Sequence, residues 1–337
     1  MKKRPTRTRR KMRTSKTAAV GIDFGGTFVK MGLVDSGGRI LERRQFTTSE
    51  ASDPNSWLER VEDETRVLLR TAEKRGLSVA GVGTGVPGQV DYDRGFVHGL
   101  VNVPGWERID LASLLQRKLG LRVVVDNDAN AMAYGEYCYG AGVGLRHAVF
   151  VTLGTGVGGG IVIDGRLHRG AYSMAGEIGH VTVDLHGRRS IMGRGGVEQY
   201  VGNRKIAERT RRAILRGRRS LISDLVGGNL DRIDPRVIAE AARREDALAL
   251  EIFDFVADCL AAVFASVTYL IQPEAFVVGG GVSQSGHLLF EPLRRHLKER
   301  LHPVFFRRLK VLRARLKTDA GVVGAAALML HQGLPGR

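Results

Sequence analysis

The feature that most constrains the fold is a strand–turn–strand pattern that occurs twice, with its glycines at the same offsets. In the first copy, Gly25-Gly26-Thr27 separates an apolar run from a second run, Phe28–Asp35. In the second copy, Gly154-Thr155-Gly156 separates His147–Leu153 from Val157–Ile163. Short apolar runs bounded by glycine are typical of buried strands joined by a tight turn. The sequence therefore predicts a duplication, two α/β halves that each open with a glycine-tipped hairpin. The alternative is two unrelated hairpins.

The rest of the chain supplies further strands and helices. Its 337 residues are enough for about two domains, and 43% apolar with 26% charged residues excludes disorder for the bulk of the chain. Strands are predicted at 39–48, 79–86, 121–125 and 275–278, and helices after Asp53 and Asp234, around 132–139, before Pro273 and over 319–331. Within 247–271, acidic residues spaced by three and four predict a buried amphipathic helix rather than a membrane span.

The net charge of +17 is concentrated in two segments, 1–16 and 188–219. We expect a basic disordered tail at 1–16 and a solvated cationic helix surface over 204–219. The alternatives are contact with nucleic acid, whose phosphates attract clustered Lys and Arg, and binding of polyphosphate as a phosphoryl donor. Two cysteines exclude a disulfide scaffold. With no signal peptide visible, they fit a reduced cytoplasmic location.

The two glycine turns are candidate anion sites. Backbone N–H groups in a turn without side chains can point at a bound anion, and Thr27 and Thr155 add hydroxyl donors. Neither turn matches the GxxxxGK[ST] loop, or the GxGxxG fingerprint in its proper context. Two such cradles facing each other suit a polyphosphate chain that lies between two domains.

Polar residues follow a predicted apolar strand at Asp126-Asn127-Asp128-Ala129-Asn130, before a helix. The carboxyl end of a strand faces the crevice where α/β proteins bind ligands. Helix capping is the simpler interpretation, since Asn and Asp are favoured caps. One cap accounts for one residue and not for the whole polar run.

Seven motifs now stand in one order along the chain. They are Asp23-x-Gly25-Gly26-Thr27-x-x-Lys30, Gly85-Val86-Pro87-Gly88-x-Val90-Asp91, Asn102-Val103-Pro104-Gly105-Trp106, Asn127-Asp128-Ala129-Asn130, Gly154-Thr155-Gly156-Val157-Gly158-Gly159-Gly160, Glu177-x-Gly179-His180 and Gly279-Gly280-Gly281. In this order they resemble the ROK-family sugar kinases, over about residues 18–330.

The resemblance implies an actin/hexokinase-like (ribonuclease H-like) two-domain α/β fold that binds ATP and a hexose in the cleft between duplicated halves. It implies a tail at 1–16, an N-terminal domain at 17–130, a C-terminal domain at 131–318, and a helix at 319–331 that packs back on the N-terminal domain. Family members are commonly dimers or tetramers, so a homo-oligomer is expected, with no membrane association.

The resemblance also implies the site residues. Asp128 matches the general base, and Asp23 the carboxylate that holds Mg²⁺ through water. Sugar contacts are implied for Gly88, Asn102, Asn127, Glu177, His180 and Glu198. Nucleotide contacts are implied for Gly25, Gly26, Thr27, Lys30, Gly154, Thr155, Gly156, Gly279, Gly280 and Gly281.

The chain departs from the family at one motif. Many ROK kinases carry Cys-x-Cys-Gly-x-x-Gly-Cys-x-Glu, a zinc motif completed by the histidine that matches His180. Here Ser190–Glu198 replaces all three cysteines and is one residue short. Without thiolates no zinc site is expected. His180 then has two interpretations, a sugar contact or a structural histidine paired with Glu177.

The predicted activity is ATP-dependent phosphorylation of a hexose hydroxyl, with glucose converted to glucose 6-phosphate. The alternatives are N-acetylmannosamine or another hexose as acceptor, and polyphosphate as donor. From another class, the alternative is a sugar-sensing regulator of the same family. We expect a kinase, because only about 17 residues precede the first strand and a helix-turn-helix module needs more.

Overall fold

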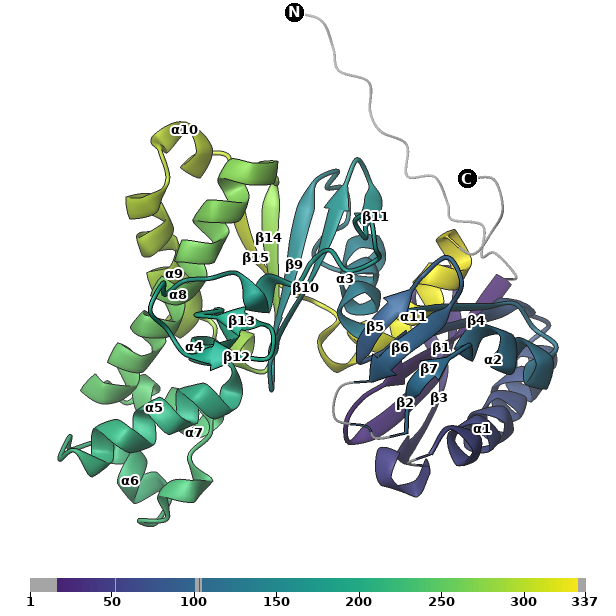
Figure 1. The fold of residues 1–337 in the computed structure, drawn as a ribbon, viewed down its shortest axis with the longest axis horizontal. Coiled ribbons are helices and arrows are strands. Elements are labelled where there is room, and N and C mark those ends of the chain that lie inside the picture. The colour runs from purple at the N-terminus through teal and green to yellow at the C-terminus, as the bar shows by residue number, and fades with distance from the viewer. Residues whose placement is uncertain (1–16, 52, 101–102, 104, 333–337) are drawn as a thin grey trace, which may run out of the picture.

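The computed structural model describes residues 17–51, 53–100, 103 and 105–332. Residues 1–16 and Asn102, for which a basic tail and a sugar contact are predicted, lie outside this range. Two lobes stand side by side, each built on a five-stranded sheet, and two helices lie between them (Figure 1). The sheet orders are β3-β2-β1-β4-β8 and β11-β10-β9-β14-β15, so the two halves repeat one topology and the predicted duplication is confirmed.

The N-terminal lobe carries its sheet strands at β1 (Thr17–Phe24), β2 (Phe28–Asp35), β3 (Ile40–Thr47), β4 (Ser78–Val86) and β8 (Val123–Asn127). Helices α1 (Pro54–Lys74) and α2 (Leu111–Leu119) cover one face, and β5 (Gly88–Asp91), β6 (Phe96–Leu100) and β7 (Glu107–Ile109) form a small second sheet. Asp53 caps α1 through the N–H groups of Asn55 and Ser56, with proline at the first helical position, as predicted.

The C-terminal lobe carries β9 (Ala148–Leu153), β10 (Val157–Ile163), β11 (Arg166–His168), β14 (Ala275–Gly280) and β15 (Lys310–Arg313). Its helices are α4 (Glu198–Val201), α5 (Asn203–Leu215), α6 (Leu221–Leu225), α7 (Pro235–Arg243), α8 (Ala247–Ile271), α9 (His287–Arg300) and α10 (Pro303–Phe306). A two-stranded hairpin, β12 (Arg189–Ser190) and β13 (Gly193–Arg194), precedes α4. Short 3₁₀ turns lie at 48–51, 178–180, 230–232, 282–285 and 317–319.

Two predictions about individual elements can be scored here. Helix α8 buries its apolar side and leaves Glu251, Asp254 and Asp258 to pair with basic side chains of its surroundings. Within the described ranges, no helix combines the length and apolarity needed to cross a bilayer. The predicted strand at 121–125 lies two residues later, because its parallel partner β4 continues the ladder through Gly85 and Val86 to Asp126 and Asn127.

Helices α3 (Asp128–Tyr139) and α11 (Ala320–His331) cross between the lobes in very close contact. A β-carbon on Gly324 of α11 would fall 1.8 Å from the carbonyl oxygen of Ala131 in α3. On the other side, a β-carbon on Gly83 of β4 would fall 1.8 Å from the carbonyl oxygen of Ala325. Only glycine fits at these positions, so small residues let α11 pack against both β4 and α3.

Candidate active site

Strand β8 runs directly into helix α3, and Asp128 is the first residue of that helix. The preceding Asn127 is the N-cap, and its Oδ1 accepts the N–H groups of Ala129 at 2.8 Å and Asn130 at 3.3 Å. Capping is therefore one real role of the polar segment. The cap also fixes the backbone that carries Asp128 at the carboxyl end of the N-terminal sheet.

Glycine at position 85 lets the start of α3 lie close over the sheet. Gly85 stands opposite Asp23 in the β1–β4 ladder and opposite Asp126 in the β4–β8 ladder. A β-carbon at Gly85 would fall 3.3 Å from Asp128 Cα. Asp128 and Asp23 are thereby placed on either side of one strand end.

The surroundings of Asp128 make it a weak acid. Burial, and next the charge of Asp23, raise the pKa of Asp128 to about 7, while the hydrogen bond from its neighbour Ala129 lowers it in part. The charge of Glu177 adds a further small increase to this pKa. A carboxyl group with a pKa near neutrality can accept a proton from a substrate and release it again.

Asp23 is a second carboxylate at this point. Burial raises its pKa, offset in part by the charge of Lys30, which stands opposite in the β1–β2 hairpin. No described residue donates a hydrogen bond to the Asp23 side chain, and its carboxylate lies against Gly321 in the first turn of α11. A half-buried carboxylate that accepts no hydrogen bond from the described residues fits a hydrated Mg²⁺, which takes oxygen ligands.

The two predicted glycine turns are both present. Gly25 N–H donates to the Phe28 carbonyl at 3.0 Å, and Gly154 N–H donates to the Gly156 carbonyl at 2.9 Å. A β-carbon on Gly26 or Gly154 would meet no atom within 4 Å, so the turns have open space beside them. Thr27 and Thr155 are exposed, and Lys30 is half-buried. These features leave room for an anion at each turn.

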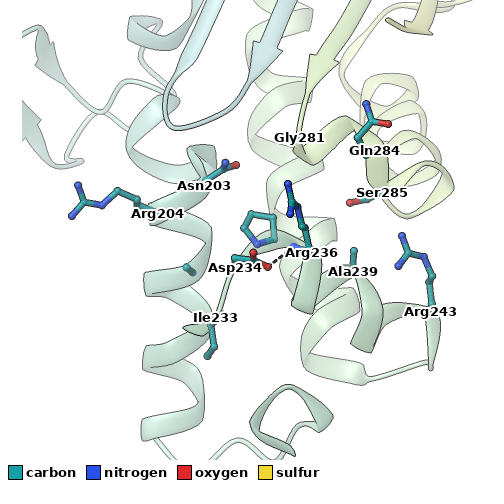
Figure 2. Close-up of a pocket in the computed structure, with 12 residues that line it drawn as sticks. Asn203, Arg204, Ile233, Asp234, Arg236, Ala239, Arg243, Gly281, Gln284 and Ser285 are labelled. Atoms are coloured by element: carbon teal, nitrogen blue, oxygen red, sulfur yellow. Dashed lines mark hydrogen bonds between the residues drawn. The ribbon is translucent and has the colours of Figure 1, made fainter. Parts of the chain in front are cut away.

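A pocket of about 490 Å³ adjoins the second turn. Asn203 lines it and donates its backbone N–H to the Gly154 carbonyl at 2.9 Å. Figure 2 shows the Arg236 side chain rising from the start of α7 toward the end of the pocket where Gly281 lies. Gly280, with φ of +82°, must be glycine, because a β-carbon there would fall 2.2 Å from the Leu153 carbonyl oxygen.

Several polar residues of this pocket were not predicted as site residues, among them Asn203, Arg236 and Gln284. The Asn203 Oδ1 atom is buried and accepts no hydrogen bond from any residue in the described ranges. Asp234, which caps α7 ahead of Arg236, was the one signal available, and it predicted only a helix start.

The predicted sugar contacts fall into three groups. Asn127 also donates its side-chain N–H to the Gly88 carbonyl at 3.1 Å, so these two residues lie together beside Asp128. His180 is the last residue of the 3₁₀ turn at 178–180, and Glu177 comes directly before that turn. His180 Nε2 and Glu177 Oε2 are 3.6 Å apart. Asn102, the remaining predicted contact besides Glu198, is not among the described residues.

Glu198 lies at the second glycine turn. Its Oε2 accepts the Val157 N–H at 2.9 Å, and a β-carbon on Gly156 would fall 2.3 Å from the same oxygen. This side chain therefore supports the turn from α4, and a contact with sugar from the same position stays a prediction.

The segment that replaces the zinc motif forms the β12–β13 hairpin. Its tip holds Ile191, whose side chain is 100% exposed, and Met192, which is partly exposed. The two cysteines of the chain, Cys138 and Cys259, lie instead on α3 and α8.

The basic segment at 204–219 forms most of α5 and the turn after it. Several of its arginines are exposed, and Arg211 and Arg218 pair with Asp231 and Glu251 at 2.8 Å. The segment therefore forms the cationic helix surface that was expected. Contact of this surface with nucleic acid or polyphosphate stays a prediction.

Comparison with known proteins places this arrangement in a family. The model of the ROK family matches residues 19–332. The glucokinase of Thermotoga maritima is 34% identical over 317 residues, which cover 93% of this chain and 98% of that protein. The structure of a ROK family glucokinase from Streptomyces griseus in complex with glucose and AMPPNP superposes with a TM-score of 0.77. It is 36% identical, over 92% of this chain and 98% of that one.

Regulators are also similar to this chain. The xylose repressor of Caldicellulosiruptor bescii is 28% identical, over 92% of this chain and 77% of that protein. The likeness to the glucokinases confirms the predicted two-domain actin-like fold. A family model that covers nearly the whole chain, together with relatives above 30% identity over almost their full length, shows that this protein belongs to the ROK family.

Proposed function

We propose that this protein transfers the γ-phosphoryl group of ATP to a hydroxyl of a hexose, with glucose as the first candidate and glucose 6-phosphate as the product. The observation that carries the proposal is the position of Asp128. It is a half-buried carboxylate with a pKa of about 7 at the start of α3, close enough to Asp23 for their charges to interact, in a protein that also carries two open glycine turns. A regulator that only senses a sugar has no need for a base tuned in this way.

The nucleotide has a place in this arrangement. The pocket of about 490 Å³ is large enough for a nucleoside, and its Asn203 donates its backbone N–H to the Gly154 carbonyl of the second glycine turn. The buried, unpartnered Oδ1 of Asn203 offers an acceptor to an amino or hydroxyl group of the nucleoside. The complex of the Streptomyces griseus glucokinase with AMPPNP supports an ATP-like donor.

Different residues of the chain have different roles in the proposed reaction. Backbone N–H groups of both turns, with Thr27 and Thr155, bind the phosphates. Asp23 would hold Mg²⁺ through water, and the metal would supply charge neutralisation on the phosphate oxygens. Asp128 orients the hexose hydroxyl and accepts its proton as the sugar oxygen bonds to the γ-phosphorus. At the same time the bond from that phosphorus to the bridging oxygen of ADP breaks, and ADP leaves.

Residues from both lobes are proposed to form the sugar-binding part of the site. Asn127 and Gly88 on one lobe, and Glu177 and His180 on the other, are proposed to contact the hexose hydroxyls, with Asn102 and Glu198 as further predicted contacts. Closure of the lobes over the sugar would exclude water, which competes as an acceptor of the phosphoryl group. We also propose that the protein acts in the cytoplasm, the location expected for a hexose kinase of this family.

The test is a coupled assay of ADP release across hexoses and N-acetylhexosamines. We expect ATP-dependent turnover with glucose, strongly reduced in Asp128→Asn. Turnover restricted to N-acetylmannosamine or another hexose would keep the kinase and change its substrate, and the same screen with polyphosphate tests the donor. Sugar binding without turnover of any acceptor, with either donor, would contradict the proposal.

A further inference from the structure

A charged contact between the lobes lies next to the proposed base and is not used in the mechanism above. Arg169, the residue after β11 in the C-terminal lobe, donates from Nε at 2.9 Å and from Nη2 at 2.7 Å to Oδ2 of Asp126 in β8. The Asp126 side chain is 2% exposed and that of Arg169 14%. A two-pronged arginine–carboxylate pair in such a buried place is rigid and directional.

Two more contacts hold the guanidinium of Arg169. It lies over the ring of Tyr92, with Cζ 3.4 Å from the ring centroid, and Nη2 donates to Gln332 Oε1 at 2.7 Å. Tyr92 follows β5 and Gln332 follows α11, so one side chain from the C-terminal lobe meets three separate segments of the N-terminal lobe and of the crossing helices.

The carboxylate of Asp126 is hydrogen-bonded to the segment that carries the proposed base, Asp128. Asp126 Oδ1 accepts the backbone N–H of Asn127 at 2.8 Å and the side-chain N–H of Asn130 at 2.9 Å. These two residues flank the first turn of α3, where Asp128 stands. Because both oxygens of Asp126 are occupied, the orientation of this turn depends on the carboxylate, and the buried carboxylate depends on the cation that compensates it.

The backbone of Arg169 contacts the loop that precedes the proposed sugar contacts of the C-terminal lobe. Its carbonyl accepts the N–H of Ala175 at 2.9 Å, which closes the loop 170–175 just before Glu177. Ser173 in that loop is within 3.5 Å of the Tyr92 N–H. Arg169 therefore touches both the loop that leads to the proposed sugar contacts and the support of the proposed base.

We propose that Arg169 is a positioning residue that fixes Asp128 relative to the segment 170–180, and so fixes the base relative to the hexose hydroxyl. This inference rests on the proposed function. Arg169 does not touch the reacting atoms. It acts through Asp126, and its loss would let the base and the sugar contacts move independently, which slows a reaction that depends on close alignment.

The experiment compares Arg169→Met, Arg169→Lys and Arg166→Met. Arg166 is an exposed arginine of β11, which makes it a matched control for charge and location. For Arg169→Met we expect kcat to fall tenfold or more while the KM for ATP stays within twofold, since the nucleotide pocket lies elsewhere in the C-terminal lobe. Arg169→Lys keeps the charge but not the paired N–H donors, so its kcat should lie between that of Arg169→Met and that of the parent. The kcat of Arg166→Met should match the parent.

A double variant separates positioning from simple damage. Asp126→Asn keeps an acceptor for Asn127 and Asn130 and removes the buried charge, so Asp126→Asn/Arg169→Met should recover part of the kcat lost in Arg169→Met. Equal losses in kcat and in ATP affinity, or no recovery in the double variant, would overturn the inference. If the parent protein phosphorylates no sugar, the proposed function fails. If the parent is active and Arg169→Met has the kcat of Arg166→Met, only this inference fails.

Discussion

The carboxylate of Asp23 lies directly against Gly321 in the first turn of α11, where a β-carbon on the glycine would fall 2.4 Å from Asp23 Cγ. The N-terminal turn of a helix carries partial positive charge and unpaired N–H groups. The lack of a side chain at position 321 therefore sets how closely the acidic group can approach that turn. A residue of α11, near the end of the chain, thus shapes a site that begins in the first strand.

Gly321→Ala is expected to displace Asp23. The added methyl group cannot be accommodated without movement, and overpacking of this kind costs about 1–3 kcal/mol of stability. We expect a lower melting temperature, and a rise in the Mg²⁺ concentration that gives half the maximal rate. A variant with parent-like Mg²⁺ dependence would show that Asp23 has no part in holding the metal.

Asp128→Asn is expected to lower kcat by roughly 10²-fold or more, the usual contribution of a general base. The amide keeps the shape of the side chain and the acceptor for the Ala129 N–H, so the hexose dissociation constant should change little. Steady-state kinetics together with calorimetric titration of the sugar measure both quantities. Turnover near that of the parent would remove Asp128 from the proposed role.

The raised pKa of Asp128 also predicts how stability depends on pH. The folded protein holds this proton up to about pH 7, whereas the unfolded chain loses it near the ordinary pKa of 3.8. Between these values the unfolded state binds fewer protons, so this group makes the folded state less stable as pH rises. Asp128→Asn should thus gain melting temperature over the parent at about pH 8 and gain little at about pH 4. An equal difference at both pH values would contradict the raised pKa.

The second glycine turn offers a matched pair of substitutions. Alanine at Gly154 meets open space, whereas alanine at Gly156 would fall 2.3 Å from Glu198 Oε2. We expect Gly154→Ala to keep the parent melting temperature and raise the KM for ATP several-fold, because its methyl group occupies space meant for phosphate. Gly156→Ala should lower the melting temperature as well. Thermal denaturation and ATP kinetics of both variants distinguish a ligand-binding turn from a purely structural one.

Glu198 has two possible partners, and one substitution separates them. Its bond to the Val157 N–H predicts that Glu198→Ala disturbs the turn and raises the KM for ATP. The family resemblance predicts a contact with the hexose and a rise in the KM for sugar. Kinetics with each substrate varied in turn measure the two effects. A change in the sugar KM alone would assign Glu198 to the hexose.

Sequence patterns predicted the fold well where the signal is local. The hairpins β1–β2 and β9–β10 and the helix starts at Asp53 and Asp234 follow from neighbouring residues alone. Glycine spacing also showed the duplication, because both turns need the same freedom from side chains. The end of β8 was misplaced, since its last two residues are polar and pair only because β4 extends beside them.

The parts of the site that escaped prediction are assembled from distant segments. The Asn203 and Arg236 side chains meet around one pocket from α5 and α7, and neither belongs to a motif. Arg169 and Asp126 are separated by 43 positions and belong to different lobes. No periodicity records such contacts, because they depend on how the two lobes come together.

The direct passage from β8 into α3 has a consequence for how this protein can diverge. An α-helix turns by about 100° per residue, so one residue gained or lost at this junction would swing the proposed base away from the cleft. Changes of chain length are therefore excluded here, while the hairpin around Ile191 stands free in solvent and can change length without disturbing the sheet. Lineages of this protein should thus differ in length at that hairpin and keep the strand-to-helix junction at constant length.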